Sequence, residues 1–348
     1  MTTPDVQTVI VGAGFSGIGA GILLDRAGLG DYQILEAGSG PGGTWFWNTY
    51  PGVAVDIPSF SYQFSFEQSA DWSRTYAKGH ELKAYAEHCV DKYGLRDRIR
   101  FGTEVTGAEY DDAADLWRVH TSGGTITARF LINGSGVLTV PKPPDIDGVN
   151  DFAGITLHTA RWDSSIDLRG KRVAIIGTGA SAVQVIPEIA PVVEHLTVFQ
   201  RTPIWCFPKL DLPLPAAARW AMRVPGGKTL QRLASQAYVE LTFPLSAQYY
   251  SVFPLADGAA RMGRSFLRRE VHDPVVRDKL TPRYAVGCKR PGFHNTYLAT
   301  YNRENVSLVT ESIERITPTG VRTADGQEHE VDVLILATGF KVMDVDSV

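Results

Sequence analysis

The sequence predicts an α/β fold with two Rossmann-like domains and a helical insertion. Three observations support this prediction. The order strand, glycine-rich turn, helix, strand occurs at residues 6–35 and again at residues 172–199. A mostly helical pattern covers residues 216–280. The 348 residues are enough for two domains, each with a core of its own.

The first repeat begins with Val6–Val11, an apolar and β-branched run that predicts a strand. A helix is expected over Ile18–Ala27, ending at Gly28, and the next strand at Tyr32–Leu35. Two strands of a meander are expected next, at Trp117–His120 and Thr125–Ile132.

The second repeat has a strand at Arg172–Ile176, a turn at Gly177–Ala182, a helix at Val183–Ile189 and a strand at His195–Phe199. Later runs also have strand character: Val306–Val309, Ile313–Ile316, Val321–Thr323 and Val331–Ala337. Because the glycine turns lie 165 residues apart, from Gly12 to Gly177, the repeats predict two domains and not a short-period array.

These patterns lead to a domain assignment with a discontinuous first domain. We assign residues 1–140 and 331–348 to the first domain, 141–151 to a proline-rich linker, 152–209 and 282–330 to the second domain, and 210–281 to the insertion. Four aromatic residues of the insertion suit either an apolar substrate pocket or ordinary packing: Phe243, Tyr249, Tyr250 and Phe253.

Composition excludes several classes of function. A net charge of −4 argues against a nucleic-acid partner. No apolar run is long enough to span a membrane, and no secretory signal precedes the first strand, so we expect a cytoplasmic protein. The three cysteines, Cys89, Cys206 and Cys288, have neither metal-site nor dithiol spacing. We therefore expect no metal.

The first glycine turn predicts a nucleotide site. Gly12, Gly14 and Gly17 form GxGxxG between a strand and a helix, where glycine allows a pyrophosphate to approach the helix N-terminus. Glu36 ends the next strand, 24 residues after Gly12. Its carboxylate would accept ribose hydroxyls and repel a 2′-phosphate, which suits FAD or NAD.

The second turn predicts a different nucleotide. It contains Gly177, Thr178, Gly179, Ser181 and Ala182. A cation, Arg201, stands 24 residues after Gly177, with Thr202 beside it, and the pair suits the 2′-phosphate of NADPH. A FAD site and an NADPH site together indicate a flavin enzyme. With no redox dithiol in the sequence, dioxygen is the expected electron acceptor.

Residues Phe152, Gly154, His158, Trp162 and Asp163 stand in the pattern FxGxxxHxxxWD. This pattern resembles the fingerprint of type I Baeyer-Villiger flavin monooxygenases. The resemblance implies that His158 and Trp162 couple movements of the two domains.

A second segment is similar to another fingerprint of the same family, GGxWxxxxYPGxxxD. It begins with Gly42, Gly43, Thr44 and Trp45, continues through Tyr50-Pro51-Gly52 and ends at Asp56. The resemblance implies that Gly43, Thr44 and Trp45 contact the flavin and that Asp56 orients an active-site arginine.

The run Gly287-Cys288-Lys289-Arg290-Pro291 resembles the loop that supplies this arginine. The resemblance implies that Arg290 is catalytic and that Lys289 contacts the NADPH phosphate. Without it, a solvated basic turn remains open. Residues 134–136 and 337–339 look like the two turns that return the chain to the FAD domain.

The resemblance implies an NADPH-consuming FAD enzyme that inserts one oxygen atom of O2 next to a ketone or aldehyde carbonyl. The family forms a C4a-peroxyflavin and yields an ester or lactone. Two alternatives stay open: a flavin monooxygenase that oxygenates nitrogen or sulfur, and a non-catalytic nucleotide-binding remnant. Relatives continue well beyond the position of Phe340, so we expect the FAD domain to be incomplete at its C-terminal end.

Overall fold

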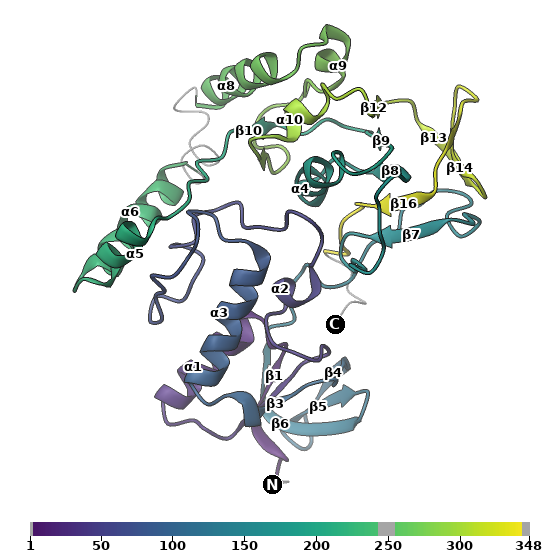
Figure 1. Ribbon diagram of the computed structural model, residues 1–348. Coiled ribbons are helices and arrows are strands. Elements are labelled where there is room, and N and C mark those ends of the chain that lie inside the picture. Colours follow the sequence, from purple (N-terminus) through teal and green to yellow (C-terminus); the bar gives the residue numbers. More distant parts are fainter. Residues whose placement is uncertain (1–2, 243–254, 343–348) are drawn as a thin grey trace. The chain divides into compact units, whose positions relative to one another are not determined.

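The computed structural model describes residues 3–242 and 255–342 and divides into two compact units. Unit 1 comprises residues 1–49, 79–142 and 340–348, and unit 2 comprises residues 50–78 and 143–339. Each unit contains a sheet with parallel strands and helices, as Figure 1 shows, so the predicted α/β class is confirmed. No helix in the described ranges is both long enough and apolar enough to cross a membrane.

Unit 1 is built on a six-stranded sheet in the order β3-β2-β1-β6-β5-β4. Its strands are β1 (Val6–Val11), β2 (Tyr32–Leu35), β3 (Ile99–Arg100), β4 (Val105–Asp111), β5 (Leu116–Thr121) and β6 (Gly124–Asn133). Its helices are α1 (Phe15–Arg26), α2 (Thr44–Trp47), α3 (Gly79–Lys92) and the 3₁₀ turn η1 (Arg96–Arg98). Strands β3, β2, β1 and β6 run parallel, whereas β5 and β4 extend the sheet as an antiparallel meander. Helices α1 and α3 contact each other, and α1 also contacts β1 and β2 (Figure 1).

Unit 2 is built on a five-stranded parallel sheet in the order β12-β9-β8-β16-β7. These strands are β7 (Ile155–His158), β8 (Arg172–Ile176), β9 (His195–Phe199), β12 (Val306–Val309) and β16 (Val333–Leu336). Small sheets add β10 (Cys206–Phe207), β11 (Gly292–Phe293), β13 (Ile313–Thr317), β14 (Gly320–Thr323) and β15 (Glu328–Glu330). The helices are α4 (Ala180–Ile189), α5 (Ala216–Arg223), α6 (Gly227–Thr242), α8 (Leu255–Glu270), α9 (Pro274–Lys279) and α10 (Tyr297–Thr300).

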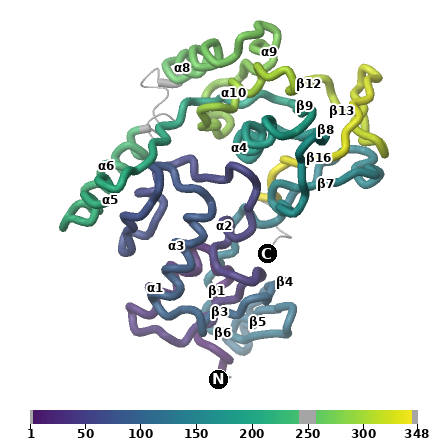
Figure 2. Tube along the Cα trace, viewed as in Figure 1, coloured from purple at the N-terminus to yellow at the C-terminus, as the bar shows by residue number. Residues whose placement is uncertain are grey.

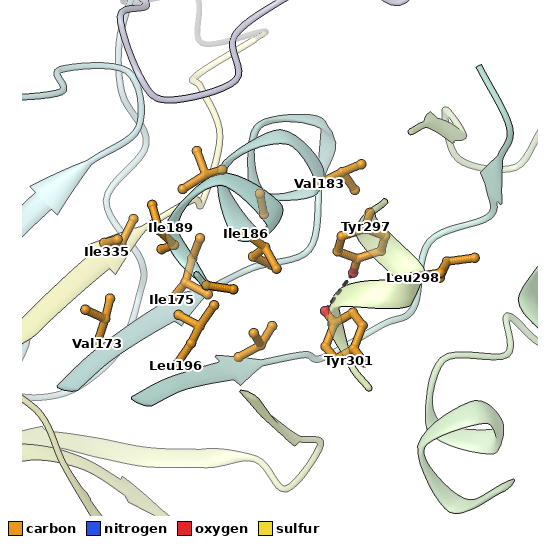
Figure 3. Close-up of a cluster of buried hydrophobic side chains, with 14 of the residues drawn as sticks. Val173, Ile175, Val183, Ile186, Ile189, Leu196, Tyr297, Leu298, Tyr301 and Ile335 are labelled. Carbon is orange, nitrogen blue, oxygen red and sulfur yellow. Dashed lines mark hydrogen bonds between the residues drawn. The ribbon is translucent and has the colours of Figure 1, made fainter. Parts of the chain in front are cut away.

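The core of unit 2 lies between its sheet and helices α4 and α10 (Figure 3). Val173, Ile175, Ile186 and Leu196 are fully buried there, and each such side chain stabilises the fold by about 1.5–3 kcal/mol. The hydroxyl of Tyr301 donates to that of Tyr297 at 2.9 Å, so the buried phenols satisfy each other. Burial raises the pKa of both.

Two expectations about the domain assignment were wrong. Strand β16 lies between β8 and β7 in unit 2, beside β7 in Figure 2, and not in the first domain. All four of its residues are buried, and an apolar run of this kind carries no information about which sheet it joins. Residues 50–78 also belong to unit 2.

The two nucleotide-binding helices begin earlier than expected. Helix α1 starts at Phe15 and α4 at Ala180, three residues before the predicted starts in each case, because the glycine turns pass directly into helix. Within residues 210–281 the structure has α5, α6, α8 and α9. The four aromatic residues from Phe243 to Phe253 lie outside the described ranges.

Candidate functional site

Close backbone packing leaves no room for side chains at the glycine turn of unit 1. Gly12 has φ +89°, and a Cβ at this position would lie 2.7 Å from the carbonyl oxygen of Gly134. A Cβ on Gly17 would lie 1.8 Å from the carbonyl oxygen of Gly12. Gly14 precedes α1 as its N-cap and offers no capping side chain. The first N–H groups of α1 therefore remain available to an anion.

Glu36 anchors this turn. It directly follows β2 and is buried, with 4% of its surface exposed. Its Oε2 accepts from the backbone N–H of Ala13 at 2.7 Å, and Oε1 accepts from that of Gly38 at 2.7 Å. A carboxylate has about four lone-pair sites, so Glu36 can hold the turn and still accept a ribose hydroxyl.

The first half of the second fingerprint packs onto the same turn. Gly42 donates to the carbonyl of Ala13 at 2.9 Å, and a Cβ on Gly43 would lie 2.8 Å from the Cα of Gly14. Thr44 and Trp45 follow in α2, where Trp45 is buried. The turn in unit 1 is therefore bordered by backbone, as a cradle for a pyrophosphate requires.

Unit 2 repeats the arrangement. Gly177 has φ +112°, and a Cβ there would lie 2.5 Å from the carbonyl oxygen of Ala337. Gly179 is the N-cap of α4, again without a capping side chain, and apart from its neighbours in the chain no atom of the described residues lies within 4 Å of its Cβ position. The turn at residues 337–339 thus stands beside Gly177 as residues 134–136 stand beside Gly12, and it lies in unit 2. The assignment of residues 331–339 to the first domain is therefore wrong, whereas the chain returns to unit 1 directly after this turn, at Phe340.

The strand-end cation of unit 2 faces solvent. Arg201 follows β9, is exposed, and makes no hydrogen bond or ion pair to another described residue. The hydroxyl of Thr178 donates to the carbonyl of Thr202 at 3.2 Å, which fixes the turn to the segment carrying Arg201. Ser181, in the first turn of α4, hydrogen-bonds to Tyr50.

The second half of the second fingerprint docks on α4. The hydroxyl of Tyr50 donates to Gln184 Oε1 at 3.2 Å. Burial raises the pKa of Tyr50, and the hydrogen bond with Ser181 partly offsets the shift. A Cβ on Gly52 would lie 2.7 Å from the carbonyl oxygen of Gln184, so only glycine permits this approach. The segment at residues 50–52 is therefore fixed against helix α4, just before Asp56.

Asp56 and Arg290 form an ion pair, although 234 residues separate them in the sequence. Arg290 Nε donates to Asp56 Oδ2 at 3.0 Å, and a second guanidinium nitrogen donates to the same oxygen. Arg290 is 66% exposed and Asp56 25%. Lys289 is exposed beside Arg290, with its Nζ 5.4 Å from the ring centroid of Tyr284.

The first fingerprint forms β7 and the turn after it. His158 Nδ1 accepts from the N–H of Ala160 at 3.0 Å, and Nε2 lies 3.3 Å from Thr338 Oγ1. The histidine therefore ties the edge strand to the turn beside Gly177. A hinge role between domains stays a prediction.

The remaining fingerprint residues have local roles. A Cβ on Gly154 would lie 2.6 Å from the carbonyl oxygen of Asp332 and from the ring of Phe152. Trp162 packs against the core of unit 2. Asp163 Oδ1 accepts from Ser165, whose side-chain and backbone hydrogen bonds lower the pKa of this carboxyl.

Sequence reasoning missed a buried lysine next to the ion pair. Lys209 is 9% exposed, and its Nζ donates to the carbonyl of Val55 at 2.6 Å. Burial lowers the pKa of Lys209 to about 8, while Asp211 and Asp56 oppose the shift. A lone lysine after Phe207-Pro208 has no periodicity that would have signalled its burial.

His294 was also missed. Its Nδ1 accepts from the N–H of Tyr297 at 3.1 Å and from that of Thr296 at 3.3 Å, at the start of α10. Burial, with the nearby Lys209 and Lys78, lowers the pKa of His294 to about 4. The imidazole is therefore neutral near pH 7.

Comparison with known proteins adds a family to this geometry. A family model described as pyridine nucleotide-disulphide oxidoreductase matches residues 9–212. A protein of Streptomyces coelicolor named Baeyer-Villiger monooxygenase is 38% identical over 341 residues, which cover 98% of this chain and 65% of the relative. Another of that name, from Pseudooceanicola batsensis, is 35% identical over 382 residues, covering 98% of this chain and 70% of the relative. The chain spans about two thirds of the length of the curated relatives that it matches.

Solved structures of monooxygenases are also similar to this chain. A structure of OTEMO in complex with FAD and NADP has a TM-score of 0.88 at 32% identity, covering 99% of this chain and 72% of that chain. An open structure of cyclohexanone monooxygenase has a TM-score of 0.85 at 34% identity, covering 98% and 75%. The cysteines Cys89, Cys206 and Cys288 form no disulfide bond with one another.

Proposed function

Because the chain belongs to the Baeyer-Villiger monooxygenase family, we propose that it binds FAD and NADPH and oxygenates a ketone or aldehyde to an ester or lactone. The observation that carries this proposal is the ion pair between Asp56 and Arg290. The segment that resembles the family's second fingerprint and the one that resembles its arginine-bearing loop meet at this contact.

The turn of unit 1 suits FAD. Its glycines leave backbone N–H groups at the start of α1, and Glu36 supplies an acceptor for ribose hydroxyls at the strand end. A buried carboxylate would repel a 2′-phosphate, which disfavours NADPH at this turn.

The turn of unit 2 suits NADPH. Gly179 leaves the N-terminus of α4 open for the pyrophosphate. Arg201 carries a permanent charge, and its planar guanidinium can bind a phosphate through two parallel hydrogen bonds. Thr202 and Lys289 would add donors on the same unit.

Bound FAD would supply the activation of dioxygen, and NADPH the hydride that reduces the flavin. The protein's own contribution is a fixed positive charge. A guanidinium is a permanent cation, and the two hydrogen bonds to Asp56 set the direction of the Arg290 side chain. A charge about 4 Å from a developing oxyanion is worth roughly 4 kcal/mol at an effective dielectric of 20. Arg290 would thus lower the barrier for attack on the carbonyl.

The test has three readouts on one protein: the flavin spectrum of the purified chain, NADPH oxidation, and product analysis with ketones, amines and thioethers. We expect bound FAD and ester formation that Arg290→Ala lowers by at least about 100-fold. Arg283→Ala is a matched control, because Arg283 lies seven residues before Arg290, is 81% exposed and pairs with Asp278. Oxygenation only of amines or thioethers would contradict the carbonyl chemistry. Retained FAD without NADPH consumption would indicate a non-catalytic protein.

A further inference from the structure

The ion pair between Asp56 and Arg290 cannot by itself hold its two segments together. Arg290 is 66% exposed, and an ion pair so open to solvent adds little to the stability of a protein. Arg290 also lies in an exposed loop, residues 287–290, with no regular secondary structure. The position of its guanidinium relative to Asp56 must therefore depend on a contact that is buried.

Lys209 makes such a contact on the Asp56 side. Its Nζ donates to the carbonyl of Val55, the residue directly before Asp56, at 2.6 Å. The same ammonium group lies 4.8 Å from the ring centroid of Tyr76, which covers it. A hydrogen bond from a charged donor in a buried place resists exchange with water more than the exposed pair does.

The backbone of Lys209 is clamped on the Arg290 side. Its N–H donates to Asn295 Oδ1 at 2.8 Å, and Asn295 Nδ2 donates back to the carbonyl of Lys209 at 2.9 Å. Asn295 follows Arg290 by five residues, through the short strand β11, which pairs with β10 just before Lys209. Lys209 thus connects the segment that carries Asp56 with the segment that carries Arg290.

We propose that Lys209 is a positioning residue that fixes the segment carrying Asp56 (residues 53–57) to the segment carrying Arg290 (residues 287–296, the Arg290 arm). Other anchors hold the Asp56 segment to different parts of unit 2. Gln184 hydrogen-bonds to Ala54 from α4, and Val55 N–H donates to the carbonyl of Ala77. Among the described residues with hydrogen bonds to Val55, only Lys209 also connects directly to the Arg290 arm.

The chemistry of Lys209 agrees with a functional placement. Burial lowers the pKa of its ammonium group to about 8, against the opposing pull of Asp211 and Asp56. A methionine would fill similar space without the cost of a buried charge. Residues kept at a cost to stability gather at functional sites.

The test is hydrogen exchange by mass spectrometry on the chain without cofactors, comparing wild type with Lys209→Met. We expect exchange about tenfold faster in peptides covering residues 53–57 and 287–296, and unchanged exchange in β8 and β9. Lys209→Arg keeps a charged donor and should restore much of the protection. Lys171→Met, at an exposed lysine of the same unit, is the matched control.

Catalysis supplies a second readout, which rests on the proposed function. Lys209→Met should lower kcat for ester formation and raise hydrogen peroxide release per NADPH, with KM for NADPH unchanged. Among the described residues, the hydrogen bonds of Lys209 go to Val55 and Asn295 and not to Arg201 or the turn at residues 177–182. A purely structural lysine would instead lower the melting temperature and leave kcat of the folded fraction unchanged.

Each outcome bears on the proposal separately. Unchanged exchange in both peptides, or faster exchange spread through β8 and β9, would overturn the positioning role whatever the activity. If wild type forms no ester while local exchange rises in Lys209→Met, the proposed function fails and the positioning role stands. If Lys209→Met does not fold, Asn295→Ala removes the same link from the other side and must give the same local increase.

Discussion

Replacing His294 by asparagine should make unit 2 less sensitive to acid. In the folded protein the pKa of His294 is about 4, whereas its ordinary value is 6.5. The unfolded chain therefore binds a proton between pH 6.5 and 4 that the folded protein does not. The stability that neutral His294 contributes is fully present above pH 6.5 and is lost as pH falls toward 4. The difference between these two pKa values corresponds to roughly 3 kcal/mol of unfolding free energy.

The structural reason is the cap of α10. Only a neutral ring nitrogen can accept the N–H groups of Thr296 and Tyr297. An asparagine oxygen can accept similar bonds without titrating. Urea unfolding can be followed by circular dichroism at steps from pH 7 to 4. Over this range the unfolding free energy of wild type should fall by up to ~3 kcal/mol more than that of His294→Asn. His272→Asn, at an exposed histidine of the same unit, should behave as wild type. If the unfolding free energies of wild type and His294→Asn fell equally with pH, the argument would be refuted.

The remaining predictions concern the two nucleotide turns. Arg201→Ala should weaken NADPH binding about 10- to 100-fold and leave NADH binding unchanged, measured by titration calorimetry. Gly177→Ala should lower unfolding free energy by roughly 2–3 kcal/mol, since its Cβ would lie 2.5 Å from the carbonyl oxygen of Ala337 at φ +112°. Gly179→Ala meets no such atom, so it should keep the melting temperature and weaken NADP binding instead. Glu36→Gln should lower thermal stability and FAD retention together. Equal melting temperatures for the two glycine variants, or an NADH affinity that falls with Arg201→Ala, would contradict these expectations.

Local sequence was sufficient where local sterics decide the structure. Strand β1 and the turn at Gly12 follow from an apolar β-branched run that stops at glycine, and both appear as expected. The same holds for β8 and Gly177. Such features depend on residues that are neighbours in the chain.

Long-range contacts explain what the sequence could not predict. Strand β16 is apolar on both faces, so its place between β8 and β7 depends on pairing partners more than 150 residues away. Lys209 is buried by its contact with Val55, 154 residues away in the chain. A lysine is usually exposed, and no local pattern predicts the exception. The pair of Asp56 and Arg290 was expected only from resemblance to a family.

Both units contain a closely packed glycine turn, but the residue at the end of the following strand has a different role in each. In unit 1, Glu36 accepts the N–H of Ala13 and so holds the turn itself. In unit 2 the residue that corresponds to Ala13 is Thr178, whose hydroxyl bonds to the carbonyl of Thr202. The turn of unit 2 is thus fixed without the strand-end side chain, and Arg201 is left in solvent for a ligand. Turn stability and nucleotide binding should therefore be inseparable in variants of Glu36, where losing one buried N–H partner costs about 1–3 kcal/mol. Variants of Arg201 should change affinity alone, and a matching loss of melting temperature in them would show that the cation also supports the fold.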